Sequence, residues 1–273
     1  AEILYPNPGF PIYESAIRFT GATAVPIPLM EEKDFSFDVA AVLDSITPST
    51  RLLILNSPAN PTGGALTREA VDALVAGLAA HPHVAVLSDE IYSRMVYDGR
   101  EHVSLLAYPE LDDRLILLDG WSKTYAMTGW RLGYGVWPER LVEGATRLSI
   151  NCHSCVNAAA QYAGIAALQG PQDSVDEMVA AFDQRRRVIV DGLNEVPGFS
   201  CRTPGGAFYA FPNIKDTGMD ARSLQTRILD EAGVATIAGT SFGAHGEGYL
   251  RFSYANSRDN IRKALERIGN LLA

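Results

Sequence analysis

The chain has 273 residues, of which 47% are hydrophobic and 20% charged, so it can bury a large core and does not have the composition of a disordered chain. Its 32 acidic and 23 basic residues give a formal net charge of −9, which argues against a general binder of nucleic acid or of anionic membranes, because phosphate groups need Lys and Arg to neutralise them. No apolar run approaches the roughly 18–20 residues of a membrane-spanning helix.

The chain opens directly on a strand at Ile3–Tyr5, with no basic segment or signal-peptide pattern before it. A fold rarely begins with a core strand that has no lead-in, and we therefore expect a further N-terminal portion to precede Ala1.

Short apolar segments then alternate with helical patterns. Thr67 caps a predicted helix whose apolar stripe consists of Val71, Leu74, Val75 and Leu78, and Pro138 is placed to open another helix. The predicted strands are Arg51–Asn56, Val84–Leu87, Leu115–Leu118 and Leu132–Val136. Continuous apolar strands alternating with helices predict an α/β fold: a mostly parallel sheet with helices on both faces.

The character changes after Pro171, where a long helix runs to Pro197-Gly198 with Arg185-Arg186-Arg187 expected on its solvated face. The remaining predicted elements are a strand at Ala207–Phe211, a helix around Ser223–Ala232, a strand at Tyr249–Tyr254 and a terminal helix capped by Ser257. We expect a large domain over residues 1–170 and a smaller α+β domain over residues 171–273, which includes the long helix.

The three cysteines do not form a disulfide framework. Cys152 and Cys155 have the spacing of redox and metal motifs, but a zinc site needs a second pair that Cys201 alone does not supply. We expect buried or half-buried thiols, no metal, and a reducing cytosol.

Ligands of open parallel sheets bind beyond the carboxyl ends of the strands. The side chains placed there are an aromatic ring, an amide, a carboxylate, a phenol, a lysine with its preceding serine, and arginines. This set suits pyridoxal 5'-phosphate, which needs a lysine for a Schiff base, a carboxylate for its ring nitrogen and a guanidinium for its phosphate.

Four motifs resemble the class I/II aminotransferases of PLP fold type I, such as aspartate aminotransferases. They are Asn-Pro-Thr-Gly at 60–63, Ser-Asp-Glu-Ile-Tyr at 88–92, Ser-Lys-Thr-Tyr-Ala-Met-Thr-Gly-Trp-Arg-Leu-Gly at 122–133, and Tyr-Leu-Arg-Phe-Ser-Tyr-Ala at 249–255. Their order matches the family across essentially the whole chain.

The resemblance implies a role for each motif residue. Lys123 would form the Schiff base and move the substrate proton, Asp89 would pair with the ring nitrogen, and Tyr92 would bond the ring oxygen. Asn60 would bond the same oxygen and contact substrate, Phe10 would lie against the ring, Ser122 and Arg131 would bind phosphate, and Arg251 would bind the substrate carboxylate. Ordinary roles compete with these: turn formation for Asn60, N-capping for Asp89, and packing for Phe10 and Tyr92.

The sequence departs from the common family pattern at Gly120, where many members carry a phosphate-binding serine, and at Ala238, where proline is usual. Relatives also carry roughly a hundred further residues before the opening strand, too many for a normal domain to lose.

The implied function is amino transfer between an α-amino acid, with aspartate favoured, and a 2-oxo acid such as 2-oxoglutarate. Two alternatives stay open: a β-lyase of the same fold, and a non-catalytic aminotransferase-like effector domain of a transcription regulator. The resemblance also implies a cytoplasmic homodimer that acts on small molecules and not on nucleic acid or membranes.

Overall fold

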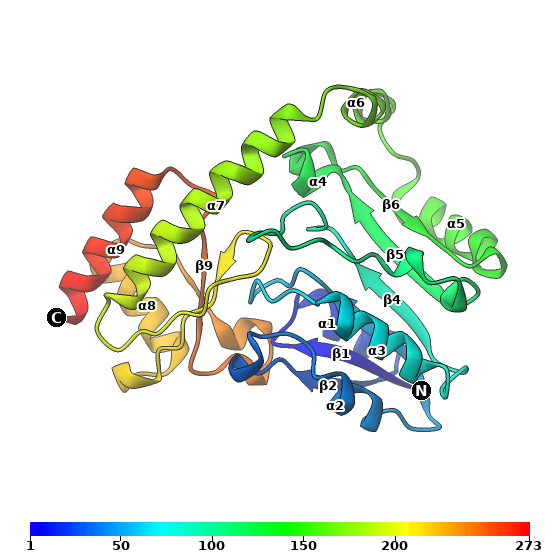
Figure 1. The fold of residues 1–273 in the computed structure, drawn as a ribbon, viewed down its shortest axis with the longest axis horizontal. Coiled ribbons are helices and arrows are strands. Elements are labelled where there is room, and N and C mark those ends of the chain that lie inside the picture. The colour runs from blue at the N-terminus through cyan, green and yellow to red at the C-terminus, as the bar shows by residue number, and fades with distance from the viewer.

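The computed structural model describes residues 1–273 and contains two β-sheets flanked by helices (Figure 1). The larger sheet has six strands in the order β2-β1-β3-β4-β5-β6. All neighbours pair in parallel except β6, which is antiparallel to β5, so the predicted mostly parallel sheet is confirmed. The bounds are β1 (Glu2–Asn7), β2 (Thr23–Pro28), β3 (Thr50–Asn56), β4 (Ala85–Asp89), β5 (Leu115–Gly120) and β6 (Gly133–Val136).

Helices cover both faces of the large sheet, as the sequence predicts. Because side chains alternate along a strand, Leu4 and Leu53 point to one face and Tyr5 and Ile54 to the other. The first face packs against α2 (Val39–Asp44) and α3 (Arg68–Leu78), and the second against α1 (Ile12–Phe19). Each face therefore has its own apolar core.

Helix α3 forms as its sequence predicts. Thr67 is the N-cap, with its side-chain oxygen accepting a hydrogen bond from the backbone N–H of Ala70. The buried residues of the helix are the four that define the apolar stripe: Val71, Leu74, Val75 and Leu78.

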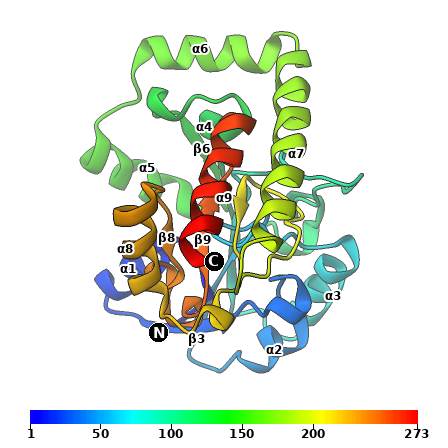
Figure 2. The ribbon, with the colours of Figure 1, turned by 90° about the vertical axis from the view of Figure 1, so that its left-hand side faces the viewer.

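Four further helices lie, in chain order, between β5 and a second, three-stranded sheet. Helix α4 (Trp121–Thr124) follows β5, and α5 (Glu139–His153) and α6 (Ala158–Gln169) follow β6. Helix α7 (Asp173–Asn194) then runs from α6 toward the second sheet (Figure 2).

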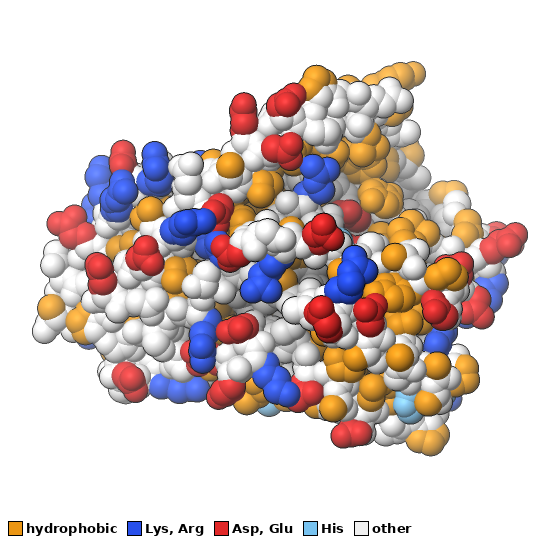
Figure 3. Space-filling view, in the orientation of Figure 1, with side chains coloured by type: hydrophobic (Ala, Val, Ile, Leu, Met, Phe, Trp, Pro, Cys, Tyr) orange, Lys and Arg blue, Asp and Glu red, His pale blue; other side chains and the backbone are white.

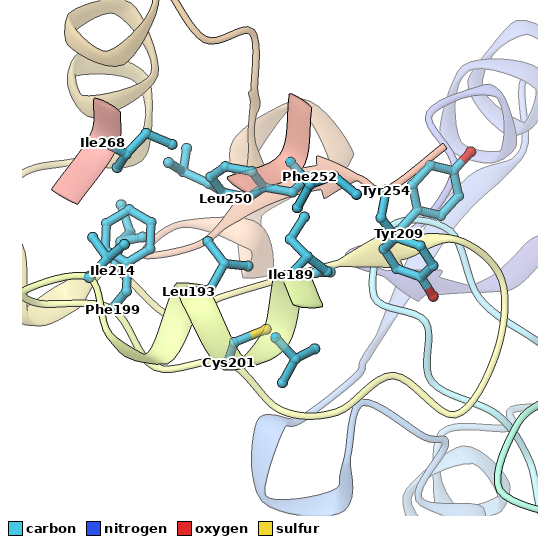
Figure 4. Packing of buried hydrophobic residues seen from close by; sticks show 14 of the residues in the cluster. Ile189, Leu193, Phe199, Cys201, Tyr209, Ile214, Leu250, Phe252, Tyr254 and Ile268 are labelled. Carbon is cyan, nitrogen blue, oxygen red and sulfur yellow. The ribbon is translucent and has the colours of Figure 1, made fainter. Parts of the chain in front are cut away.

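The second sheet is antiparallel, with the order β7-β9-β8. Its elements are β7 (Tyr209–Ala210), α8 (Ala221–Ala232), β8 (Ile237–Ala238), β9 (Leu250–Ser253) and α9 (Arg258–Leu272). Side chains of α7, α8, α9 and these strands form one apolar core, shown in part in Figure 4. We propose that this unit and α7 correspond to the small domain, residues 171–273.

Several elements differ from the sequence prediction. The strand predicted at Ala207–Phe211 shrinks to two residues, because Ala207 has a φ of +58°, outside the β region. Elements that the sequence did not predict include α1, α2, α6, β2 and β8. Strand β2 contains Pro26 and Pro28, which weaken a strand pattern but are tolerated at this edge of the sheet.

The expectation for the cysteines is wrong at two of three positions. Cys152 and Cys155 are exposed near the end of α5, and only Cys201 is buried. Helix α5 has no buried residue, so Cys152 near its C-terminus is not covered by a core, and Cys155 lies just beyond the end of the helix. No group of three or more His, Cys, Asp or Glu side chains is arranged to hold a metal ion.

Large hydrophobic side chains are exposed along β6, α5 and α6. They include Tyr134, Val136, Leu148, Ile165 and Leu168, and hydrophobic atoms gather below α6 on the right of Figure 3. None of the helices combines the length and apolarity needed to cross a membrane.

The solvated face predicted for the arginine run of α7 is wrong for Arg186, whose side chain is only 2% exposed. Its guanidinium donates hydrogen bonds to the carboxylates of Asp98 and Asp183 and to the backbone carbonyl of Pro204. It also lies 4.6 Å from the ring centroid of Tyr97. Arg186 therefore fastens α7 to the loop that follows β4, and periodicity alone cannot distinguish such a paired arginine from a solvated one.

We expect Arg186→Leu to lower the free energy of unfolding by about 2 kcal/mol, because it leaves the carboxylate of Asp98 and the buried carbonyl of Pro204 without their donor. Arg187→Leu is the matched control: Arg187 is 68% exposed and pairs only with Asp183, so its loss should cost less than about 0.5 kcal/mol. Urea unfolding of both variants measures the difference, and equal losses would contradict the role given to Arg186.

Candidate active site

A cavity of about 430 Å³ lies at the carboxyl edge of the large sheet, where that sheet meets the second one. The register brings this edge together, because Asn56 of β3 lies beside Asp89 of β4, which in turn lies beside Leu118 of β5. All eight residues singled out from the sequence line the cavity: Phe10, Asn60, Asp89, Tyr92, Ser122, Lys123, Arg131 and Arg251.

Asp89 is held firmly at the end of β4. The hydroxyl of Tyr13 donates a 2.6 Å hydrogen bond to its Oδ2, and the backbone N–H of Ile91 donates to its Oδ1 at 3.3 Å. Asn56 donates to the backbone carbonyl of Asp89 at 3.0 Å. Burial raises the pKa of Asp89, whereas the Tyr13 and Ile91 bonds favour the charged form and oppose that rise.

Lys123 lies on α4, the short helix that begins directly after β5. Its Nζ is 5.5 Å from the ring centroid of Phe208 and 5.9 Å from that of Tyr92. Burial lowers the pKa of the Lys123 ammonium, and the positive charges of Arg251 and Arg131 lower it further. More of this amine is therefore neutral near pH 7 than in an exposed lysine.

The glycine at position 120 has a steric explanation. A Cβ built on Gly120 would lie 2.9 Å from the Cα of Gly133 and 3.0 Å from the carbonyl oxygen of Leu132. A serine here would require the β5–β6 backbone to move, so this chain has no room for the hydroxyl that the common pattern places at Gly120.

The guanidinium of Arg251 lies between the two sheets. Its Nη1 donates a 3.0 Å hydrogen bond to Oδ1 of Asn60, and its carbon Cζ lies 4.6 Å and 4.8 Å from the ring centroids of Tyr209 and Phe242. Its Nε is buried and has no hydrogen-bond partner. A buried donor of this kind is free to bind an anion.

The hydroxyl of Tyr92 is 2.9 Å from that of Tyr209, and Tyr92 is only 3% exposed. Burial raises the pKa of Tyr92, as does the neighbouring Tyr209, so its phenol stays protonated. Tyr92 therefore keeps a proton that it can donate in a hydrogen bond.

The other three predicted residues form the remaining wall. Phe10 meets the ring of Tyr13 edge-on, with centroids 5.8 Å apart. Arg131 has a φ of +56°, and its Nη1 donates to the carbonyl of Thr128 at 2.9 Å. Ser122 directly precedes Lys123 on α4.

Sequence reasoning missed Tyr13 and Tyr209, which also line the cavity and bond two of its residues. Tyr13 stands three residues after Phe10 on the predicted rim, so it could have been included with it. Tyr209 falls in a segment predicted as a regular strand. Pro204-Gly205-Gly206 is a turn signal directly before it, but it does not reveal that the positive φ falls on Ala207.

Comparisons with known proteins agree with this geometry. A family model described as aminotransferase class I and II matches residues 1–268. An aromatic-amino-acid aminotransferase 2 of Thermococcus litoralis is 38% identical, over 99% of this chain and 70% of that protein, and an aspartate aminotransferase of Geobacillus stearothermophilus is 39% identical, over 98% and 69%. The crystal structure of an aromatic aminotransferase from Pyrococcus horikoshii OT3 superposes with a TM-score of 0.95 and 37% identity, over 99% of this chain and 73% of that one.

We expect Tyr13→Phe to raise the pKa of Asp89 further, because a donor to the charged carboxylate is lost. The carboxyl carbon shift of Asp89, followed by NMR against pH, measures this change. Tyr134→Phe is the control: its hydroxyl donates to Asp119 instead, so it should raise the pKa of Asp119 and leave Asp89 unchanged. An unaltered Asp89 titration in Tyr13→Phe would contradict the argument.

Proposed function

Since this chain belongs to the class I and II aminotransferase family, we propose that it binds pyridoxal 5'-phosphate at Lys123 and moves an amino group from aspartate to a 2-oxo acid such as 2-oxoglutarate. The observation that carries the proposal is that one cavity is lined by a lysine of lowered pKa, a carboxylate held by two hydrogen bonds, and an arginine whose Nε has no hydrogen-bond partner. Relatives that are named aminotransferases support the aminotransferase reaction, and product analysis separates it from the β-lyase alternative, which has the same fold.

The side chains of the cavity fit the cofactor. A lysine, a carboxylate, hydrogen-bond donors and two arginines are the groups that an aldehyde, a pyridine nitrogen, a ring oxygen and a phosphate require. When bound, the cofactor supplies an electron sink for the bonds at the substrate Cα.

Lys123 would hold the cofactor through Nζ until the substrate amine displaces it. The freed Nζ would then take a proton from the substrate Cα and deliver it to the cofactor carbon. A base for this step must be neutral at the working pH. Burial and the two nearby guanidinium groups, which lower the pKa of Lys123, favour that neutral form.

Asp89 would face the ring nitrogen and keep it protonated. The bond from Tyr13 holds one carboxylate oxygen in place, and the N–H of Ile91 holds the other. Both donors stabilise the anion that a protonated ring nitrogen requires.

The rest of the cavity would orient the cofactor. Tyr92 stays protonated and would donate a hydrogen bond to the ring oxygen, and the Asn60 amide would bond the same oxygen. Phe10 would lie against the ring. Arg131 and Ser122 would bind the phosphate.

Arg251 would bind the α-carboxylate of the substrate. Asn60 and two aromatic rings fix its guanidinium, and its buried Nε still lacks a partner. A carboxylate would satisfy that donor through a bidentate pair.

Aspartate as the amino donor is supported by relatives named aspartate aminotransferase in Pyrococcus horikoshii and Geobacillus stearothermophilus, although the relative in Thermococcus litoralis is named for aromatic amino acids. Rates with aspartate, tyrosine and alanine as donors to 2-oxoglutarate test this choice. A higher kcat/KM for tyrosine would make an aromatic amino acid the donor. The homodimer and the cytoplasmic location stay proposals that rest on the family resemblance.

We expect Lys123→Ala to abolish both amino transfer and the visible absorbance of the bound cofactor, because no other lysine lines the cavity. Lys263→Ala, on an exposed position of α9, should leave both unchanged. Absorbance spectra after dialysis with the cofactor and a coupled assay report the result. A visible band that survives in Lys123→Ala would end the assignment.

We expect Arg251→Leu to raise KM for amino-acid and 2-oxo-acid substrates by roughly a hundredfold, because a buried charge-assisted pair is lost. Arg251→Lys keeps the charge but not the planar pair of donors, so it should recover only part of the affinity. Steady-state kinetics with both substrates measure this, and an unchanged KM would place the carboxylate elsewhere.

A further inference from the structure

We propose that Tyr209 is a positioning residue with two separable tasks: its ring fixes the guanidinium of Arg251, and its hydroxyl fixes the phenol of Tyr92. The inference rests on the proposed function, in which those two side chains bind the substrate carboxylate and the cofactor ring oxygen. Tyr209 thereby links the two halves of the site.

The ring task follows from the packing around Arg251. The Arg251 side chain lies on β9 and carries a buried charge with a single hydrogen-bond acceptor, Oδ1 of Asn60. Its Cζ lies 4.6 Å and 4.8 Å from the ring centroids of Tyr209 and Phe242. A guanidinium held by rings keeps its plane without using its donors, so Nε stays available for a ligand.

The hydroxyl task follows from the environment of Tyr92. The only side-chain partner of its buried oxygen is the Tyr209 hydroxyl, at 2.9 Å. A phenol that accepts a hydrogen bond from a neighbour has its own O–H free to donate to another acceptor. When Tyr209 donates to Tyr92, the Tyr92 proton is therefore directed away from Tyr209.

The backbone before Tyr209 is held in a strained conformation. Ala207 is fully buried with a φ of +58°, a region that residues other than glycine rarely adopt. Its carbonyl accepts hydrogen bonds from the hydroxyls of Tyr97 and Tyr254, and its N–H donates to the carbonyl of Met95. These bonds fix the turn from which Tyr209 projects, and in Figure 4 the Tyr209 oxygen points away from the aliphatic core.

Two variants separate the tasks in the cofactor-loaded protein. Tyr209→Phe keeps the ring and removes the hydroxyl, whereas Tyr209→Leu removes both. Tyr162→Phe, a change at a 76% exposed position on α6, is the control. The two readouts are the dissociation constant of succinate, a non-reacting dicarboxylate, and the pH midpoint of the visible absorbance.

We expect Tyr209→Leu to weaken succinate binding about tenfold, and Tyr209→Phe to stay within about twofold of the wild type. Both variants should raise the absorbance midpoint by about half a pH unit. A hydrogen bond from Tyr92 to the ring oxygen lowers the basicity of the lysine-bound cofactor, and both variants remove the Tyr209 hydroxyl that orients Tyr92 for this bond. A residue with only a structural role would not give this difference, in which Tyr209→Phe keeps the affinity for succinate but still shifts the absorbance midpoint.

Any other outcome contradicts one of the two tasks proposed for Tyr209. Unchanged readouts in both variants overturn the positioning role, and equal loss of succinate affinity in both overturns the separate ring task. If Tyr209→Leu does not fold, an unshifted midpoint in Tyr209→Phe still overturns the hydroxyl task. A wild type without visible absorbance overturns the proposed function and this inference with it, whereas a normal wild type with unaffected variants overturns this inference alone.

Discussion

The hydrogen bond from Tyr13 to the carboxylate of Asp89 is the contact on which the geometry of the site depends. A carboxylate taken from water tends to become neutral, and burial raises the pKa of Asp89 accordingly. The phenol of Tyr13, supplied by α1, favours the charged form and also fixes its direction. The parallel pairing of β4 with β3 and β5 then determines which side chains stand around it.

Each of the two sheets supplies part of the cavity. Lys123, Asp89 and Asn60 come from the carboxyl edge of the large sheet, whereas Arg251 and Tyr209 come from the small one. In the proposed function, the large sheet would therefore supply the amine and the small sheet would supply the site for the substrate carboxylate. The division explains why the motif at 249–255, on β9, lies far in sequence from the other three motifs.

Much of the fold and of the site could be predicted because both follow from local patterns. Buried strands read as apolar runs, Thr67 marks the start of α3, and polar residues that follow parallel strands must meet at one edge. The predictions failed where distant contacts decide. Arg186 is buried because Asp98 approaches it from another element, Tyr209 is aimed by the strained turn at Ala207, and β2 tolerates its prolines because it lies at the edge of the sheet.

The close approach of β5 and β6 limits how this site can evolve. Gly120 and Gly133 are paired across the two strands, and a methyl group on Gly120 would meet the Cα of Gly133. Any residue larger than glycine at position 120 therefore requires the backbone opposite to move, because its Cβ would meet main-chain atoms of Gly133 and Leu132. A second substitution at Gly133 cannot make room, since that residue has no side chain to remove, and a side chain at position 120 consequently needs a wider spacing of β5 and β6.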